Sequence, residues 1–199
     1  MAREKLATRI RREQIVEAAL SLIAVHGVRK LSVAVLARRV GLVPSALYRH
    51  FASKQEILQA AVQLIGQKAT ENVREVSDLT PHALGRLELL LMRIIKMIRE
   101  LQAMPRIIFS EGMSSDHPAG KRQAYGVLKS VLSGIEAIIR EGQARGEVRT
   151  DMDAKSLAVM FWGMIPSAVI LWHMSDGRFD VTRQAEKSWR LIKEALRAK

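Results

Sequence analysis

The chain has no cysteine among its 199 residues, so disulfide bridges and thiol chemistry are excluded. Proline and aromatic residues are also scarce, with 5 prolines and 5% aromatic residues. Acidic residues are few beside basic ones: 20 Asp and Glu stand against 32 Lys and Arg, a formal net charge of +12. Residues 1–60 hold 11 basic and 4 acidic side chains, a net of +7. A basic surplus concentrated in this way is typical of a surface that binds phosphates.

The sequence also lacks the patterns that mark catalytic sites. No Ser/His/Asp arrangement, paired carboxylates, phosphate-binding P-loop or dinucleotide glycine motif stands out, so we expect no enzyme and no cofactor. Glu111, Asp116 and His117 match no recognised metal spacing, and we expect no metal site. The charged start, Met-Ala-Arg-Glu-Lys, is followed by no apolar stretch, so we expect no secretory signal and a cytoplasmic protein.

Nearly the whole sequence has helical spacing of its apolar residues, and strand-like alternation is absent. Helices are predicted from Thr8 to His26, from Ser32 to near Val40, from Pro44, from Ser53, and in five further segments between Pro81 and Ala198. The predicted fold class is therefore all-α, with an N-terminal three-helix domain joined to a C-terminal helical bundle. We expect a DNA-binding domain over residues 1–52, a connecting helix from 53 to about 75, and an effector-binding and dimerisation domain over 53–199.

The most informative stretch runs from Ser32 to Phe51 and predicts two short helices joined at Gly41. This pattern is a helix-turn-helix, whose second helix enters a DNA major groove. Ser45 and the methyl group of Ala46 are suited to base edges. The side chains suited to phosphates are those of Ser32, Tyr48, His50 and Lys54. Packing against Phe51 remains an alternative role for Tyr48, and helix capping alone remains one for Ser32.

Residues 41–51, Gly-Leu-Val-Pro-Ser-Ala-Leu-Tyr-Arg-His-Phe, together with Ser53-Lys54, resemble the signature of the tetracycline-repressor (TetR/AcrR) family. The resemblance covers roughly residues 8–66 and implies a homodimeric bacterial transcription regulator, usually a repressor, with a C-terminal bundle that binds a small effector. It also implies that Pro44 and the six residues named above face DNA. Val43 departs from the pattern, because the family often has Ser or Thr there and valine cannot cap a helix.

The run from Leu157 to Trp172 has no charged residue. It is shorter than the roughly 20 residues of a membrane span, and it contains Gly163 and Pro166, so we expect no membrane association. A helix this apolar needs a partner, and a second copy of the chain is the simplest one. The predicted dimer interface consists of Met164, Ala168, Ile170 and Leu171.

Eight methionines lie in the C-terminal region, where flexible thioether side chains suit a pocket for varied apolar ligands. An ordinary helical core is the alternative. Tyr125 is the expected polar group of the pocket. The predicted lining is Met92, Met97, Phe109, Tyr125, Met160 and Trp162.

Together these features predict a ligand-responsive transcriptional regulator that binds a palindromic operator in double-stranded DNA as a homodimer. An apolar small molecule is expected to release it from the DNA. Two alternatives stay open at this point. One is an architectural DNA-binding protein without an effector, and the other is a helical ligand carrier or enzyme.

Overall fold

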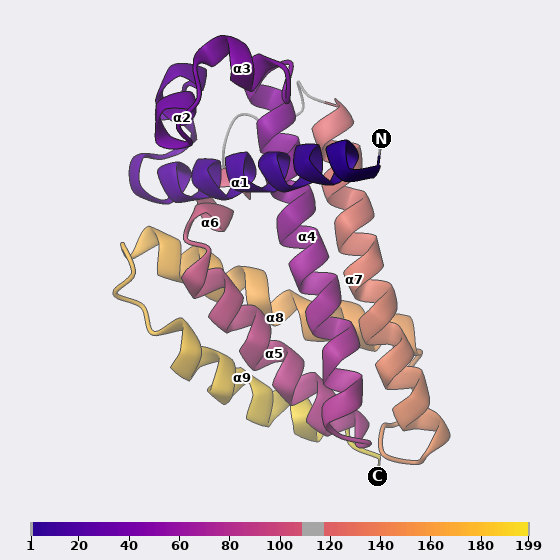
Figure 1. Cartoon of the computed structure of the whole chain (residues 1–199). Coiled ribbons are helices and arrows are strands. Elements are labelled where there is room, and N and C mark those ends of the chain that lie inside the picture. The colour runs from indigo at the N-terminus through magenta and orange to yellow at the C-terminus, as the bar shows by residue number, and fades with distance from the viewer. Residues whose placement is uncertain (1, 109–117, 199) are drawn as a thin grey trace. The chain divides into compact units, whose positions relative to one another are not determined.

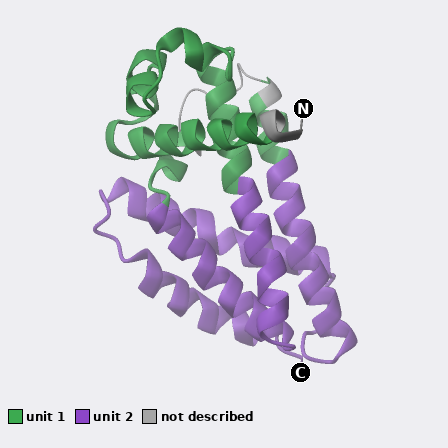
Figure 2. Cartoon of the chain, in the orientation of Figure 1, with its two compact units in different colours: residues 1–65, 101–125 green, residues 66–100, 126–199 purple. Residues whose placement is uncertain are grey.

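The computed structural model describes residues 2–108 and 118–198 of the chain. Within these ranges all the regular elements are helices, apart from one isolated antiparallel bridge between Val148 and Arg197 (Figure 1). The predicted all-α fold class is therefore confirmed. The chain forms two compact units, of residues 1–65 with 101–125 and of residues 66–100 with 126–199 (Figure 2).

Unit 1 is built around the helix α1 (Ala2–His26), followed by a single 3₁₀ turn, η1 (Val28–Lys30). Two short helices come next, α2 (Val33–Arg39) and α3 (Pro44–Tyr48), and then the start of α4 (Lys54–Leu79). The unit is completed by α6 (Ala103–Ile108) and the start of α7 (Pro118–Ala144). Its core consists of apolar side chains at helical spacing, chiefly Ile15, Ala19, Ile23, Leu36, Leu47 and Phe51.

Unit 2 contains the remainder of α4 and α7, together with α5 (Ala83–Glu100), α8 (Ala154–Met174) and α9 (Val181–Leu196). The apolar face of α5 supplies much of the core. Phe161 of α8 meets Trp189 of α9 edge to face, with ring centroids 6.2 Å apart. Arg86 is buried, and its guanidinium donates to the Thr80 carbonyl at 2.8 Å and to Glu141 at 2.7 Å. A buried charge is tolerated here because it is paired with a carboxylate and hydrogen-bonded to a carbonyl.

Helices α4 and α7 approach closely at two glycines. A Cβ on Gly66 would lie 2.5 Å from Cγ1 of Val127, and a Cβ on Gly134 would lie 2.5 Å from Cγ1 of Val73. Because Gly66 meets Val127 and Val73 meets Gly134, the two helices run in the same direction with a constant offset. Each valine fills the space that the missing side chain of the opposite glycine leaves.

Capping side chains mark the starts of several helices. The hydroxyl of Ser53, where a helix start is predicted, accepts from the backbone N–H of Glu56 at 3.2 Å and caps α4. Asp153 caps α8 in the same way through Ser156. The predicted start at Pro81 is two residues early, because the Thr80 hydroxyl accepts from the N–H of His82 at 3.3 Å and the helix begins only at Ala83.

Helix α8 is the one described helix that meets the length and hydropathy criteria for a membrane span, with a mean hydropathy of 1.6. It packs against α9 and α5, and Phe161, Ile165 and Val169 face the interior of unit 2. Core helices of globular proteins meet the same criteria, so the composition of α8 does not by itself indicate a membrane.

Candidate nucleic-acid interface and effector region

The segment from Ser32 to Phe51 forms two helices joined by a tight turn, as the sequence predicts. Gly41 has a φ of 69°, a left-handed conformation that favours glycine. The N–H of Leu42 donates to the carbonyl of Ala37 at 2.8 Å and closes the turn. Leu36, Ala37 and Leu47 are buried beneath it. These contacts fix α2 and α3 against each other, which is the arrangement of a helix-turn-helix.

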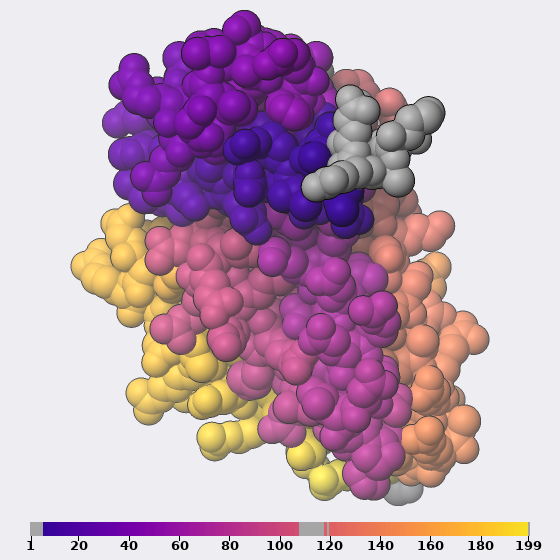
Figure 3. All heavy atoms as spheres, viewed as in Figure 1, coloured from indigo at the N-terminus to yellow at the C-terminus, as the bar shows by residue number. Residues whose placement is uncertain are grey.

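The second helix presents a polar outer side. Pro44, Ser45 and Arg49 are exposed, and Tyr48 is 53% exposed. Figure 3 shows the segment that contains α2 and α3 on the surface of unit 1. Sequence analysis did not select Arg49, although its place directly after Tyr48 on a basic segment was a usable signal. A guanidinium at this position is suited to a phosphate or a guanine edge.

Ala46 does not lie where the sequence-based interpretation expects it. It is only 8% exposed and faces the interior of unit 1 together with Leu47. The short helix turns by about 100° per residue, so Ser45 and Tyr48 share the outer side while Ala46 and Leu47 share the inner one. We therefore correct the expected contact between the Ala46 methyl group and a thymine, and Ala46 acts as a packing residue.

Three other residues predicted to contact DNA have side chains that are hydrogen-bonded or enclosed within unit 1. The Ser32 hydroxyl caps α2 by accepting from the N–H of Val35 at 3.2 Å. Nζ of Lys54 donates to the carbonyl of Arg29 at 3.4 Å, and partial burial lowers the pKa of Lys54. Nδ1 of His50 is enclosed and has no hydrogen-bond partner in the part of the chain that the structure describes.

The start of α3 lacks a side-chain cap. Val43 occupies the N-cap position and makes no capping hydrogen bond, as its side chain predicts. Pro44 follows at the first helical position, where its missing N–H removes one donor that would otherwise need a partner. The helix spans only five residues. Its orientation therefore depends on the contacts that it makes with the rest of unit 1.

The end of this segment is joined to its neighbours by Arg12 of α1, which sequence analysis missed. Nη1 of Arg12 donates to the carbonyl of His50, and Nη2 donates to Oε1 of Glu56 at 2.9 Å. The guanidinium lies 4.0 Å from the centroid of the Phe51 ring. Oε2 of Glu56 accepts from the N–H of Ala52 at 2.7 Å. The hydrogen bond from Arg12, followed by that from Ala52, lowers the pKa of Glu56.

Family models account for both parts of the chain. The model described as bacterial regulatory proteins of the tetR family matches residues 15–61, and the model described as the C-terminal region of YsiA-like proteins matches residues 66–195. The chain belongs to the TetR family of transcriptional regulators. The first match covers the helix-turn-helix, so this TetR-family chain is a DNA-binding regulator.

Relatives of similar length match nearly the whole chain. Nucleoid occlusion factor SlmA of Vibrio vulnificus (strain YJ016) is 22% identical over 188 residues, which cover 94% of this chain and 96% of that protein. FadR of Bacillus subtilis, solved in complex with stearoyl-CoA, has a TM-score of 0.79 at 21% identity and covers 92% of this chain and 98% of its own. FadR of Bacillus halodurans, a fatty acid degradation regulator, has a TM-score of 0.80 at 21% identity over 94% and 97%. The two FadR structures show that the fold is shared.

The residues predicted to line an effector pocket lie in different surroundings in this TetR-family chain. Met97 is buried on α5, where Nδ2 of Asn72 approaches its sulfur at 3.9 Å. Met92 is half-buried on the same helix, and Trp162 is half-buried on α8. Met160 lies on the exposed side of α8, and Tyr125 is largely exposed on the part of α7 that belongs to unit 1. Phe109 lies outside the described residues.

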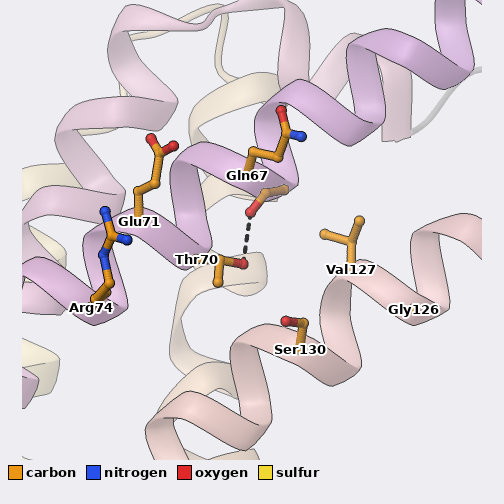
Figure 4. Close-up of a pocket in the computed structure, with 8 residues that line it drawn as sticks. Gln67, Thr70, Glu71, Arg74, Gly126, Val127 and Ser130 are labelled. Atoms are coloured by element: carbon orange, nitrogen blue, oxygen red, sulfur yellow. Dashed lines mark hydrogen bonds between the residues drawn. The ribbon is translucent and has the colours of Figure 1, made fainter.

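The cleft that the structure describes lies between α4 and α7 in unit 2, and its volume is about 430 Å³. Figure 4 shows the Val127 and Ser130 side chains directed from α7 toward α4, where Thr70 donates to the Gly66 carbonyl at 2.9 Å. None of the predicted methionines lines it. The lining consists of Gly66, Gln67, Thr70, Glu71, Arg74, Gly126, Val127 and Ser130.

The predicted dimer residues are divided between two sides of α8. Ile170 and Leu171 are exposed in the single chain, and Met164 is half-buried. Ala168 is 5% exposed, so it packs inside unit 2 and contributes no surface to a second copy. The position of Ala168 on the inner side follows from its spacing of seven residues from the buried Phe161.

Proposed function

We propose that this TetR-family chain is a transcriptional repressor that binds a palindromic operator as a homodimer and is released by a largely apolar small molecule. The observation that carries the DNA-binding part is the exposed row of Ser45, Tyr48 and Arg49 on the second helix of a helix-turn-helix. Arg38 and Arg39 of α2 are also exposed and add positive charge on the same unit. We place its action in the bacterial cytoplasm, at the nucleoid while it is bound to DNA.

The proposed dimer rests on an uncovered apolar face of α8. The exposed large apolar side chains on this helix are Val159, Met160, Ile170, Leu171 and Met174. At about 100° per residue these positions lie on one side of α8. Leu191 of the adjacent helix α9 is 76% exposed and extends the apolar surface. A two-fold dimer buries such a face against its own copy and presents two recognition helices to two half-sites.

The proposed effector site is the cleft between α4 and α7. The two glycine contacts hold the helices close together at Gly66 and Gly134, while Thr70 and Ser130 between them have small side chains that leave space. The volume of about 430 Å³ falls in the range of small-molecule sites. Neither Arg74 nor Glu71 has an ion-pair partner among the described residues, so either is available to a polar group of the ligand. The methionine and aromatic set named above stays a separate prediction.

The proposed mechanism is a shift between two dimer states. Effector favours a state in which the two recognition helices no longer match adjacent major grooves, and by linkage DNA weakens effector binding by the same factor. Because α4 runs without interruption from Lys54 to Leu79, it contributes residues to the DNA-binding unit and to the cleft.

Binding to DNA is tested with a duplex selected from a randomised library by the wild-type protein. We expect a two-fold symmetric site with half-sites about one or more helical turns apart. Affinity should fall by about 10³-fold or more between low and moderate salt, because the contacts to phosphates release counterions. Protection of a single unpaired half-site, or a titration that does not change with salt, would contradict the proposal.

Release by effector is tested with stearoyl-CoA as the probe, because the FadR relative was solved with it. At about 100 times its dissociation constant, a ligand should stabilise the fold by about 2.7 kcal/mol and should release the selected duplex. Ser130→Phe should fill the cleft and abolish both effects while operator binding is kept. Ser133→Phe is the matched control, since Ser133 is an exposed residue of α7 that does not line the cleft.

A second candidate is a DNA-binding protein that acts without an effector. The match to proteins named nucleoid occlusion factor over 94% of this chain favours keeping it. If a screen of acyl-CoA thioesters and other amphiphilic ligands produced no thermal shift and no release of the duplex, this candidate would replace the effector-controlled repressor.

A further inference from the structure

The contacts of Arg12 converge on the short stretch between the recognition helix and α4. Helix α3 ends at Tyr48, and the residues that accept or stack against the guanidinium are His50 and Phe51 directly after it. The third partner, Glu56, lies in the first turn of α4. A single side chain of α1 therefore joins three elements whose sequence separations reach 44 residues.

The three contacts use different parts of one planar group. The two terminal nitrogens donate along the edge of the guanidinium, and its central carbon lies over the Phe51 ring. Arginine has five donors in a fixed plane, so an arrangement of this kind fixes the direction of the group as well as its position. The Glu56 carboxylate is fixed as well, because its second oxygen accepts from the backbone N–H of Ala52.

Apart from its packing against α2, the recognition helix has few restraints. It is five residues long, its first turn has no side-chain cap, and its inner side consists of Ala46 and Leu47. Helices this short are not stable by themselves, so their direction is set by what holds their two ends. Arg12 holds the stretch that follows the C-terminal end of α3, because its guanidinium donates to the His50 carbonyl.

We propose that Arg12 is a positioning residue of the DNA-binding surface. It sets the direction of α3, so that Ser45, Tyr48 and Arg49 reach the groove together, and it does so through Glu56, Phe51 and the His50 carbonyl without contacting DNA. The clamp of Arg12 and Glu56 then controls how well the protein distinguishes its operator from other duplexes, rather than how strongly it is attracted to DNA in general.

For the variant Glu56→Gln, a positioning role and a simple charge effect predict opposite changes in affinity for the operator. Removal of a carboxylate makes the protein more positive, so electrostatics alone would strengthen binding to every duplex. Loss of positioning should instead weaken binding to the selected operator by about tenfold, the size of one charge-assisted hydrogen bond, while affinity for a scrambled duplex stays equal or rises. Both affinities are measured by fluorescence anisotropy on the full-length protein.

Variants of Arg12 itself complete the test. Arg12→Gln should lower the ratio of operator to scrambled affinity by about tenfold. Arg12→Lys should restore part of this ratio, because lysine can pair with Glu56 but cannot also bond the His50 carbonyl and stack on Phe51. Arg11→Gln removes the same charge from an exposed neighbour on α1 and should leave the ratio unchanged.

The possible outcomes distinguish a positioning role of Arg12 from an ordinary contribution of positive charge. A lowered ratio in Glu56→Gln and Arg12→Gln, with partial recovery in Arg12→Lys, supports the proposal. An operator affinity of Glu56→Gln at or above that of the wild type overturns it. So does an equal loss on both duplexes in Arg12→Gln and Arg11→Gln, which would make Arg12 an ordinary contributor of positive charge. Thermal unfolding of each variant shows that the comparison is made on folded protein.

Discussion

Ser45 and Ala46 are neighbours in the chain, but the helix separates their roles. Ser45 is exposed and available to DNA, whereas Ala46 is packed beneath the helix. From the sequence, both could be assigned to the groove because both are small. The packing of α3 against α2, which turns Ala46 and Leu47 inward, decides which one faces outward.

Substitutions on α3 should therefore have three different effects. Tyr48→Phe should weaken binding to all duplexes alike, because the hydroxyl is assigned to a phosphate. Ser45→Ala should change which operator is selected from a random library. Ala46→Val should instead destabilise the fold by about 1–3 kcal/mol, since it overpacks a buried position. If Tyr48→Phe altered the preferred sequence and left overall affinity intact, the assignment would be wrong.

Glu56 should make the stability of the protein depend on pH. Its pKa is lowered in the folded state, chiefly by the hydrogen bond from Arg12, so its contribution is present above the unfolded value of about 4.3 and is lost as the pH falls through the folded value. Thermal unfolding of the wild type and of Glu56→Gln should differ at neutral pH and converge in acid. Asp153, whose pKa is also lowered, is retained in both proteins, so it cancels in the comparison.

Arg12 illustrates what residue spacing cannot predict. Its partners lie 38 and 44 positions away, and no periodicity connects residues so far apart. The caps at Ser32 and Ser53, by contrast, act on backbone groups three residues away, and the sequence predicted helix starts at both residues. Local hydrogen bonds could be predicted because their geometry is fixed by the helix itself.

At the scale of the helices, the close approach of α4 and α7 depends on two glycines, which have no side chain. Helix periodicity predicted the existence of both helices, and their boundaries agreed to within a few residues wherever a cap was present. It did not predict that Gly66 and Gly134 bring the helices together, because a glycine inside a helix has no preferred partner. The expected pocket of methionines was likewise inferred from helical spacing. Such spacing shows which residues share one face of a helix, but it does not show which other helix packs against that face.

Gly66→Ala should destabilise unit 2 by about 1–3 kcal/mol, because the new methyl group would overlap Val127. The double variant with Val127→Ala should recover most of this loss. Gly126→Ala is the control within the same pair of helices, since a Cβ at Gly126 meets nothing within 4 Å. It should stabilise the protein by up to about 1 kcal/mol through helix propensity. Urea unfolding of the four proteins measures these differences, and a stabilising Gly66→Ala would contradict the close approach.

At the scale of the whole molecule, the oligomeric state is the decisive property. Ile170→Glu should produce monomers, because it places a charge in the proposed apolar interface, and operator affinity should fall with the loss of paired half-sites. Leu89→Glu on α5 is the matched control, since Leu89 and Ile170 are both 37% exposed in the single chain. Analytical ultracentrifugation measures the outcome. A wild-type monomer at micromolar concentration, or equal dissociation by both variants, would remove the proposed interface.

The two compact units are interleaved along the chain, because unit 1 needs residues 101–125 in addition to residues 1–65. The packing of α6 against α1 is part of that unit. Residues 66–100 of unit 2 separate the two segments of unit 1 in the sequence. A single crossover within this stretch between the genes of two relatives would therefore give unit 1 an α1 from one parent and an α6 from the other. New operator specificities should therefore arise more readily by point changes on α3 than by exchange of whole units, and a designed chimera should transfer both segments together.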